Sequence, residues 1–126
     1  MGRSKKILLV DDEKDLVSTV TFRLEANGYE VVVAYDGEEA LRLAKSEAPD
    51  LIILDLMLPK IDGYKVCATL KNDRKYKHIP VMLFSARAQE TDRRSGKAAG
   101  ADAYMTKPFE PKALLEKVKE LTTRSL

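Results

Sequence analysis

Short apolar runs alternate with amphipathic segments along the whole chain. Five runs have the continuous apolar character of strands buried on both faces of a parallel sheet, at 7–10, 31–34, 51–54, 81–84 and 103–105. Apolar residues recur at helical spacing in segments marked by Leu24, Ala44, Leu70 and Leu121. The segment 86–99 is also predicted to be helical, although much of it is polar. Five alternations of strand and helix predict one α/β domain, a doubly wound (βα)5 parallel sheet.

Polar residues stand at the carboxyl ends of four of the predicted strands. The first strand is followed by Asp11 and Asp12, the third by Asp55, the fourth by Ser85 and the fifth by Lys107. Right-handed crossovers bring the carboxyl ends of parallel strands to one edge of the sheet, where open α/β sheets bind their ligands. We therefore expect these five side chains to meet in one site.

Three carboxylates gathered in one place repel one another unless a cation lies among them. Oxygen ligands of this kind suit Mg²⁺ (or Mn²⁺), which often shares its coordination sphere with phosphate. Lys107 would add a positive charge for the same anion, and Ser85 a hydroxyl donor. Taken singly, Asp11 and Asp12 could cap the next helix, and the other residues could be ordinary loop positions. Their joint occurrence favours a phosphate-handling site in which Asp55 is a candidate nucleophile.

The composition is that of an ordinary globular domain. Of 126 residues, 44% are hydrophobic and 33% charged, and 22 basic against 20 acidic residues leave a net charge of +2. This near-balance gives no warrant for binding nucleic acid or a membrane. The single cysteine, Cys67, falls among apolar helical positions and is interpreted as a core residue. No apolar run approaches the ~18 residues of a membrane span and no signal peptide is recognisable, so a cytoplasmic setting is expected.

Four motifs carry a resemblance to a known family. They are the acidic-pair segment 7–13, the segment 54–59 followed by Asp62–Gly63, the step 84–86, and the closing segment 100–109. Together they resemble the receiver domain of two-component response regulators, the CheY-like superfamily, over nearly the whole chain. The resemblance implies a flavodoxin-like five-stranded sheet in the order 2-1-3-4-5.

The resemblance also implies roles in phosphoryl transfer and switching. Asp55 would accept the phosphoryl group, Lys107 would pair with the phosphoryl oxygens, and Ser85 would move to hydrogen-bond them. The peptide bond between Lys107 and Pro108 would be cis. Tyr104 would follow Ser85 by turning inward, and an aromatic side chain packed on the last helix is the alternative for this residue.

The same resemblance implies a set of metal ligands. Asp12 and Asp55 would bind Mg²⁺ directly, together with the backbone carbonyl of Met57, and Asp11 would act mainly through a bound water. Met57 and Arg87 flank the site, and we hypothesise that they tune the lifetime of the phosphoryl group.

The implied partners are those of a signalling switch. A histidine kinase or a histidine phosphotransfer protein would supply the phosphoryl group. The surface of the fourth helix, fifth strand and fifth helix would then change, to regulate a downstream protein or output domain or to drive a homodimer. Such a domain catalyses its own phosphorylation and dephosphorylation but is not a conventional turnover enzyme. We expect 1–126 to be one receiver domain, with its core at about 5–124 and no output domain.

Other functions are compatible with parts of the pattern. A receiver-like docking module that signals without phosphate would have the same fold. A phosphohydrolase similar to the haloacid dehalogenase family would want an aspartate where Met57 stands. A flavodoxin-like cofactor binder would need a phosphate loop in place of Asp11 and Asp12. A nuclease built on the carboxylates would need a basic groove.

Overall fold

The computed structural model describes residues 4–86, 94, 95 and 97–123. The five strands are β1 (Lys6–Val10), β2 (Glu30–Ala34), β3 (Leu51–Asp55), β4 (Val81–Ser85) and β5 (Ala103–Thr106). The four helices within the described ranges are α1 (Lys14–Ala26), α2 (Gly37–Glu47), α3 (Gly63–Lys71) and α5 (Pro111–Thr123). Most of the helix predicted at 86–99 lies outside the described residues. In the part of this segment that is described, residues 94, 95, 97 and 98 are helical.

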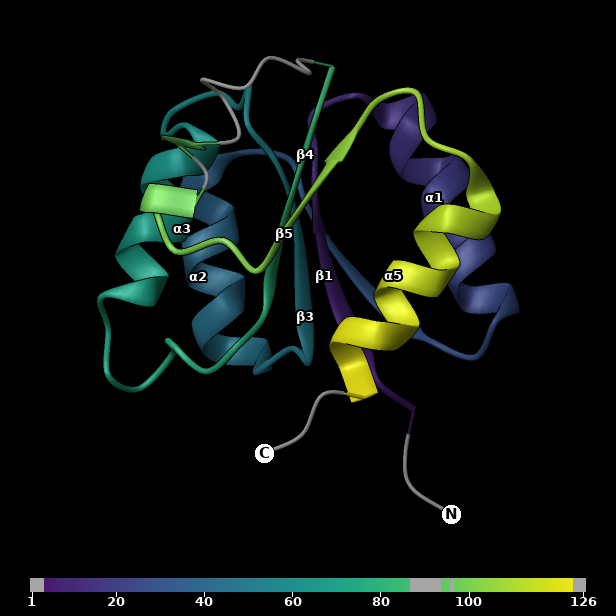
Figure 1. Ribbon diagram of the computed structural model, residues 1–126, viewed down its shortest axis with the longest axis horizontal. Helices are drawn as coiled ribbons and strands as arrows, with labels where there is room; N and C mark the ends of the chain where they lie inside the picture. The colour runs from purple at the N-terminus through teal and green to yellow at the C-terminus, as the bar shows by residue number, and fades with distance from the viewer. Residues whose placement is uncertain (1–3, 87–93, 96, 124–126) are drawn as a thin grey trace.

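The strands form one parallel sheet in the order β2-β1-β3-β4-β5, which confirms the predicted fold class and strand order. Figure 1 shows α2 and α3 on one face of the sheet and α1 and α5 on the other. β1 begins and α5 ends at the lower edge, so the carboxyl ends of the strands lie at the opposite, upper edge. In the described part of the chain, every helix is too short or too polar to cross a bilayer.

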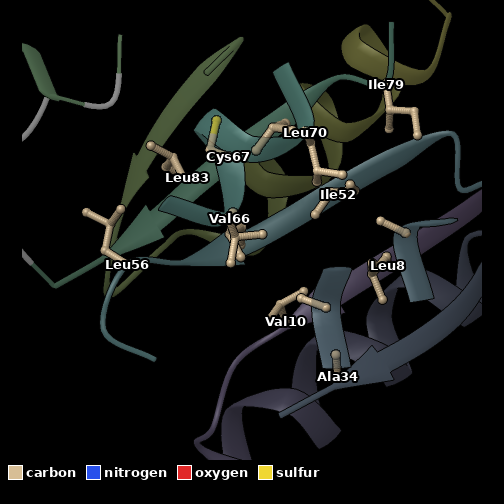
Figure 2. Packing of buried hydrophobic residues seen from close by; sticks show 14 residues of the cluster. Leu8, Val10, Ala34, Ile52, Leu56, Val66, Cys67, Leu70, Ile79 and Leu83 are labelled. Carbon is tan, nitrogen blue, oxygen red and sulfur yellow. The ribbon is translucent and has the colours of Figure 1, made fainter. Parts of the chain in front are cut away.

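Side chains alternate between the two faces of the central strands, and this alternation divides the core in two. Leu8 and Ile52 point toward α2 and α3, where they pack with the buried Val66, Cys67 and Leu70 (Figure 2). The intervening strand residues pack instead with the inner faces of α1 and α5, in a cluster that includes Ile7, Leu9, Ile53, Leu24 and Leu114. Because both faces are covered by helices, the strand sequences are continuous apolar runs. The prediction that Cys67 is a core residue is confirmed.

Two aspartates fix the starts of α2 and α3, the helices that border the upper edge. The Asp36 carboxylate accepts a hydrogen bond from the Glu39 N–H at 2.8 Å. The Asp62 carboxylate accepts one from the Lys65 N–H at 3.0 Å. Both are N-cap bonds, which satisfy a backbone donor that has no partner within its own helix.

Two glycines allow the loop after β3 to pass between these helix starts. The Gly63 N–H donates to the Leu56 carbonyl at 3.0 Å, and a Cβ at Gly63 would overlap the Asp55 carbonyl oxygen. The Gly37 N–H donates to the Pro59 carbonyl at 3.3 Å, and a Cβ there would overlap the Ile61 carbonyl oxygen. Any larger residue would push the loop away, so the two glycines hold the segment that follows Asp55 in place.

Candidate functional site

Strand register brings the polar strand ends together at the upper edge. Val10 of β1 lies opposite Leu54 of β3, so the next residues, Asp11 and Asp55, are neighbours across the sheet. Asp55 in turn lies opposite Phe84, the residue before Ser85. The site therefore assembles from segments far apart in sequence because the parallel strands start and stop in register.

The three aspartates predicted as metal ligands form one cluster. Asp11, Asp12 and Asp55 each offer a carboxylate oxygen, and these oxygens all lie within 4.8 Å of one another. Asp11 and Asp55 are buried, with 0% and 4% of their surface exposed, whereas Asp12 is open to solvent. The cluster is thus closed toward the sheet and accessible from outside through Asp12.

Burial and crowding perturb the acceptor candidate, Asp55. Desolvation is the largest cause and the charge of Asp11 the second, and together they raise the pKa of Asp55 from 3.8 to about 6. Lys107 and a hydrogen bond from the Met57 N–H, 3.4 Å from Asp55 Oδ1, lower this pKa but do not offset the burial. The site therefore disfavours a third negative charge in the absence of a cation.

Lys107 reaches into the cluster from the segment after β5. Its Nζ donates hydrogen bonds to Asp11 Oδ2 at 2.8 Å and to Glu13 Oε1 at 2.9 Å, and it lies 3.7 Å from Asp55 Oδ1. Burial by itself lowers the pKa of Lys107, but the bonds to Asp11 and Glu13 and the charge of Asp55 outweigh it, so the pKa lies above its usual 10.5. Lys107 therefore carries its full charge inside the site at neutral pH.

Two aromatic rings support the lysine. Its Nζ lies 5.3 Å from the centroid of the Phe84 ring, within the range of a cation–π interaction. The Phe84 ring in turn packs on Phe109 at 5.2 Å between centroids. The lysine ammonium thus lies close to an aromatic ring as well as to carboxylates.

Glu13 is the site residue that our reasoning from the sequence missed. We considered the acidic pair before it as ligands or caps, but gave Glu13 itself no role. Its backbone occupies the N-cap position of α1, where Ser, Thr, Asp and Asn are preferred over longer side chains. The sequence alone carried no clear signal for this role, because the partner of Glu13 is 94 positions away in the chain.

The remaining predicted residues lie around the cluster. Met57 follows Asp55 at the rim, and 60% of its surface is exposed. Ser85 is buried at the end of β4, and its backbone carbonyl accepts a hydrogen bond from the Lys107 N–H at 2.7 Å. The Lys107–Pro108 peptide bond is cis, as the resemblance implied. Arg87 lies outside the described residues.

Tyr104 is half-buried and packs against the core cluster beneath α2 and α3. It lies beside Leu83 in the register of β4 and β5. The alternative of a side chain packed with the last helix is not what the packing shows, because α5 covers the other face of the sheet.

The donor set fits a hard divalent cation. All three candidate side-chain ligands are carboxylates, two of them are buried, and their oxygens are close enough to share one ion. Oxygen-only sets of this kind suit Mg²⁺ or Mn²⁺ rather than a softer metal. A cation there would also relieve the repulsion that raises the pKa of Asp55.

Comparisons with known proteins agree with this site and fold. The family model of the response regulator receiver domain matches residues 7–119. The chain is 47% identical over 122 residues to the alkaline phosphatase synthesis transcriptional regulatory protein PhoP of Bacillus subtilis, covering 97% of this chain and 50% of that protein. It therefore spans about half the length of this relative.

Solved structures give the same result. The chemotaxis response regulator CheY4 of Vibrio cholerae is 32% identical with a TM-score of 0.88, over 94% of this chain and 98% of that one. The receiver domain of the sensor histidine kinase PA1611 of Pseudomonas aeruginosa has a magnesium ion coordinated in its active site cleft. It is 28% identical with a TM-score of 0.89, over 96% of this chain and 99% of that one.

The fold and the carboxylate cluster define a doubly wound α/β domain with a candidate metal site at the carboxyl ends of its strands. Within that class, the chain belongs to the response regulator receiver domain family of two-component signal transduction. The resemblance stated from the four sequence motifs is confirmed.

Proposed function

We propose that this domain is a phosphoacceptor switch that takes a phosphoryl group on Asp55 from a histidine kinase or a histidine phosphotransfer protein. The observation that carries the proposal is the placement of Asp55. It is a buried carboxylate within a three-aspartate cluster, and the Lys107 ammonium lies 3.7 Å away. A carboxylate with a cation beside it, at the carboxyl end of a central strand, can receive an anionic group.

In the transfer, a carboxylate oxygen of Asp55 attacks the phosphorus of the donor. The new P–O bond forms as the bond from phosphorus to the donor nitrogen breaks, and the electron pair of that bond returns to the imidazole. Because the pKa of Asp55 is about 6, most of this carboxyl is ionised at pH 7 and above and can act as the nucleophile. Lys107 neutralises part of the charge on the transferred group.

Mg²⁺ would be held by the carboxylates of Asp11, Asp12 and Asp55, with the Met57 carbonyl as a further ligand. When bound, it supplies positive charge that offsets the negative charge of the phosphoryl oxygens. The magnesium ion coordinated in the related PA1611 receiver supports this assignment.

The product places a new anionic group next to Ser85 and Lys107, and this drives the switch. In our proposal the Ser85 hydroxyl moves to hydrogen-bond the phosphoryl group, and Tyr104 turns further inward in response. The surface of the fourth helix, β5 and α5 then binds a downstream protein, an output domain or a second copy of the chain. This whole cycle takes place in the cytoplasm, within one domain and without turnover of a separate substrate.

Intact mass after incubation with Mg²⁺ and acetyl phosphate tests the proposal. We expect the wild type and the control Asp73→Asn to gain the mass of one phosphoryl group, and Asp55→Asn to gain none. A gain in Asp55→Asn would move the acceptor elsewhere. If the wild type shows no gain and no response to beryllofluoride either, the domain is a docking module that works without phosphate.

A further inference from the structure

Lys107 contacts Glu13, a residue that has no role in the proposed phosphoryl transfer. The Lys107 ammonium has three protons, and hydrogen bonds to Asp11 Oδ2 at 2.8 Å and Glu13 Oε1 at 2.9 Å occupy two of them. Asp55 Oδ1 is farther, at 3.7 Å. The Lys107 ammonium is therefore bonded to residues of the segment after β1, and it does not reach hydrogen-bond distance of the Asp55 carboxylate.

The backbone of Glu13 is fixed at both of its polar groups. Its N–H donates to Asp11 Oδ1 at 2.9 Å, and its carbonyl accepts from the Val17 N–H at 3.0 Å, in the first turn of α1. The direction of the side chain is thus set by the helix start. Within the described part of the chain, that side chain makes no capping hydrogen bond, and it extends to Lys107 instead.

The Glu13 side chain is largely exposed to solvent, whereas the lysine that it contacts is largely buried. The exposed fraction of the Glu13 side chain is 61%, and that of the Lys107 side chain is 11%. Glu13 also stands outside the group of carboxylates that could share a metal ion. It can therefore pair with the lysine whether or not that group binds a cation.

We propose that Glu13 is a positioning residue, which retains Lys107 beside Asp11 in the unphosphorylated domain and thereby slows phosphoryl uptake at Asp55. This inference rests on the proposed function. When the Lys107 ammonium turns toward phosphoryl oxygens on Asp55, its bond to Glu13 is weakened or lost. An interaction present before the reaction and absent in the transition state raises the barrier. Because Glu13 is largely exposed, solvent weakens the pair, and the expected effect on the rate is about two- to five-fold.

Two variants of Glu13 separate this contact from a general effect of charge. Glu13→Gln keeps the length of the side chain and removes its charge. Glu13→Asp keeps the charge but is one methylene shorter, and aspartate at an N-cap position favours its own helix backbone. Glu116→Gln, on the exposed face of α5, removes the same charge away from the site and serves as the control.

The first measurement is the rate of phosphorylation by acetyl phosphate with Mg²⁺, followed by intact mass. We expect both Glu13 variants to react about two- to five-fold faster than the wild type, and Glu116→Gln to react at the wild-type rate. If only Glu13→Gln is faster, the effect is reduced repulsion of the anionic donor, and the proposal is overturned. Unchanged rates in both variants overturn it as well.

The second measurement follows Lys107 itself by NMR, without phosphate or metal. Its side-chain signal, assigned by comparison with Lys107→Arg, should shift in both Glu13 variants and stay in place in Glu116→Gln. A signal that stays in place in all variants would show that Glu13 does not hold the lysine. If the wild type gains no phosphoryl mass, the proposed function and the rate effect both fail, and the NMR signal shows separately whether the contact exists.

Discussion

Asp55 is expected to destabilise the metal-free domain at neutral pH. Its carboxylate is buried beside Asp11, and the contacts with Lys107 and the Met57 N–H do not compensate for that burial. Replacing Asp55 by asparagine keeps the shape and the acceptor oxygen for the Met57 N–H, but removes the charge. We therefore expect Asp55→Asn to be more stable than the wild type when no metal is present.

The pKa of Asp55 sets the size and the pH dependence of this gain. The pKa rises from an ordinary 3.8 to about 6 in the folded domain, a difference that corresponds to at most about 3 kcal/mol. Between these two values the folded state binds more protons than the unfolded state, so the wild type loses stability as the pH rises from about 4 to about 6. Above about pH 6 the loss is complete, and below about pH 4 both states are protonated.

Urea unfolding in EDTA, followed by circular dichroism at pH values from 4 to 8, measures this difference. Asp55→Asn should exceed the wild type by about 1–3 kcal/mol at pH 7.5 and by little at pH 4. Glu116→Gln, which removes an exposed charge on α5, should show no such trend. The reasoning would be refuted if Asp55→Asn and the wild type were equally stable at pH 7.5. It would also be refuted if the gain in unfolding free energy were the same at pH 4 and at pH 8.

Three further outcomes are expected. Asp12→Asn should weaken Mg²⁺ binding by about tenfold in calorimetry, because it removes one of three carboxylates, and unchanged affinity would place the ion elsewhere. Gly63→Ala should lower the free energy of unfolding by about 1–3 kcal/mol in urea, since its Cβ overlaps the Asp55 carbonyl, and an unshifted midpoint would contradict the tight approach. Met57→Asn should change the rate of dephosphorylation, because the side chain lies exposed at the rim, whereas Phe22→Asn, at an exposed apolar side chain of α1, should not.

The order of the elements and the identity of most of the site could be predicted from the sequence. Continuous apolar runs such as 51–54 indicate strands covered on both faces, because a half-exposed strand would alternate with polar residues. Five such runs separated by helical patterns leave few topologies, since crossovers are right-handed and short. Asp55 and Lys107 could then be placed at one edge, because the ends of parallel strands coincide there.

Alternation along each strand also determines which of its residues share a face, although not which helices cover that face. Residues in alternating positions along a strand point to opposite sides, so Leu9 and Ile53 had to pack apart from Leu8 and Ile52. Asp11 and Asp55 each come two positions after Leu9 and Ile53, so the same alternation places the two carboxylates next to each other at the ends of neighbouring strands.

Only the tertiary structure decided how the polar side chains share their contacts. Glu13 and Lys107 are separated by 94 positions in the chain, and their 2.9 Å contact depends on how the start of α1 and the end of β5 are packed. Likewise, Tyr104 could have packed on either side until the sheet was built, and the packing places it under α2 and α3. Apolar periodicity is a property of neighbouring residues and can be read locally, whereas distances of a few ångströms between charges depend on the whole packed fold.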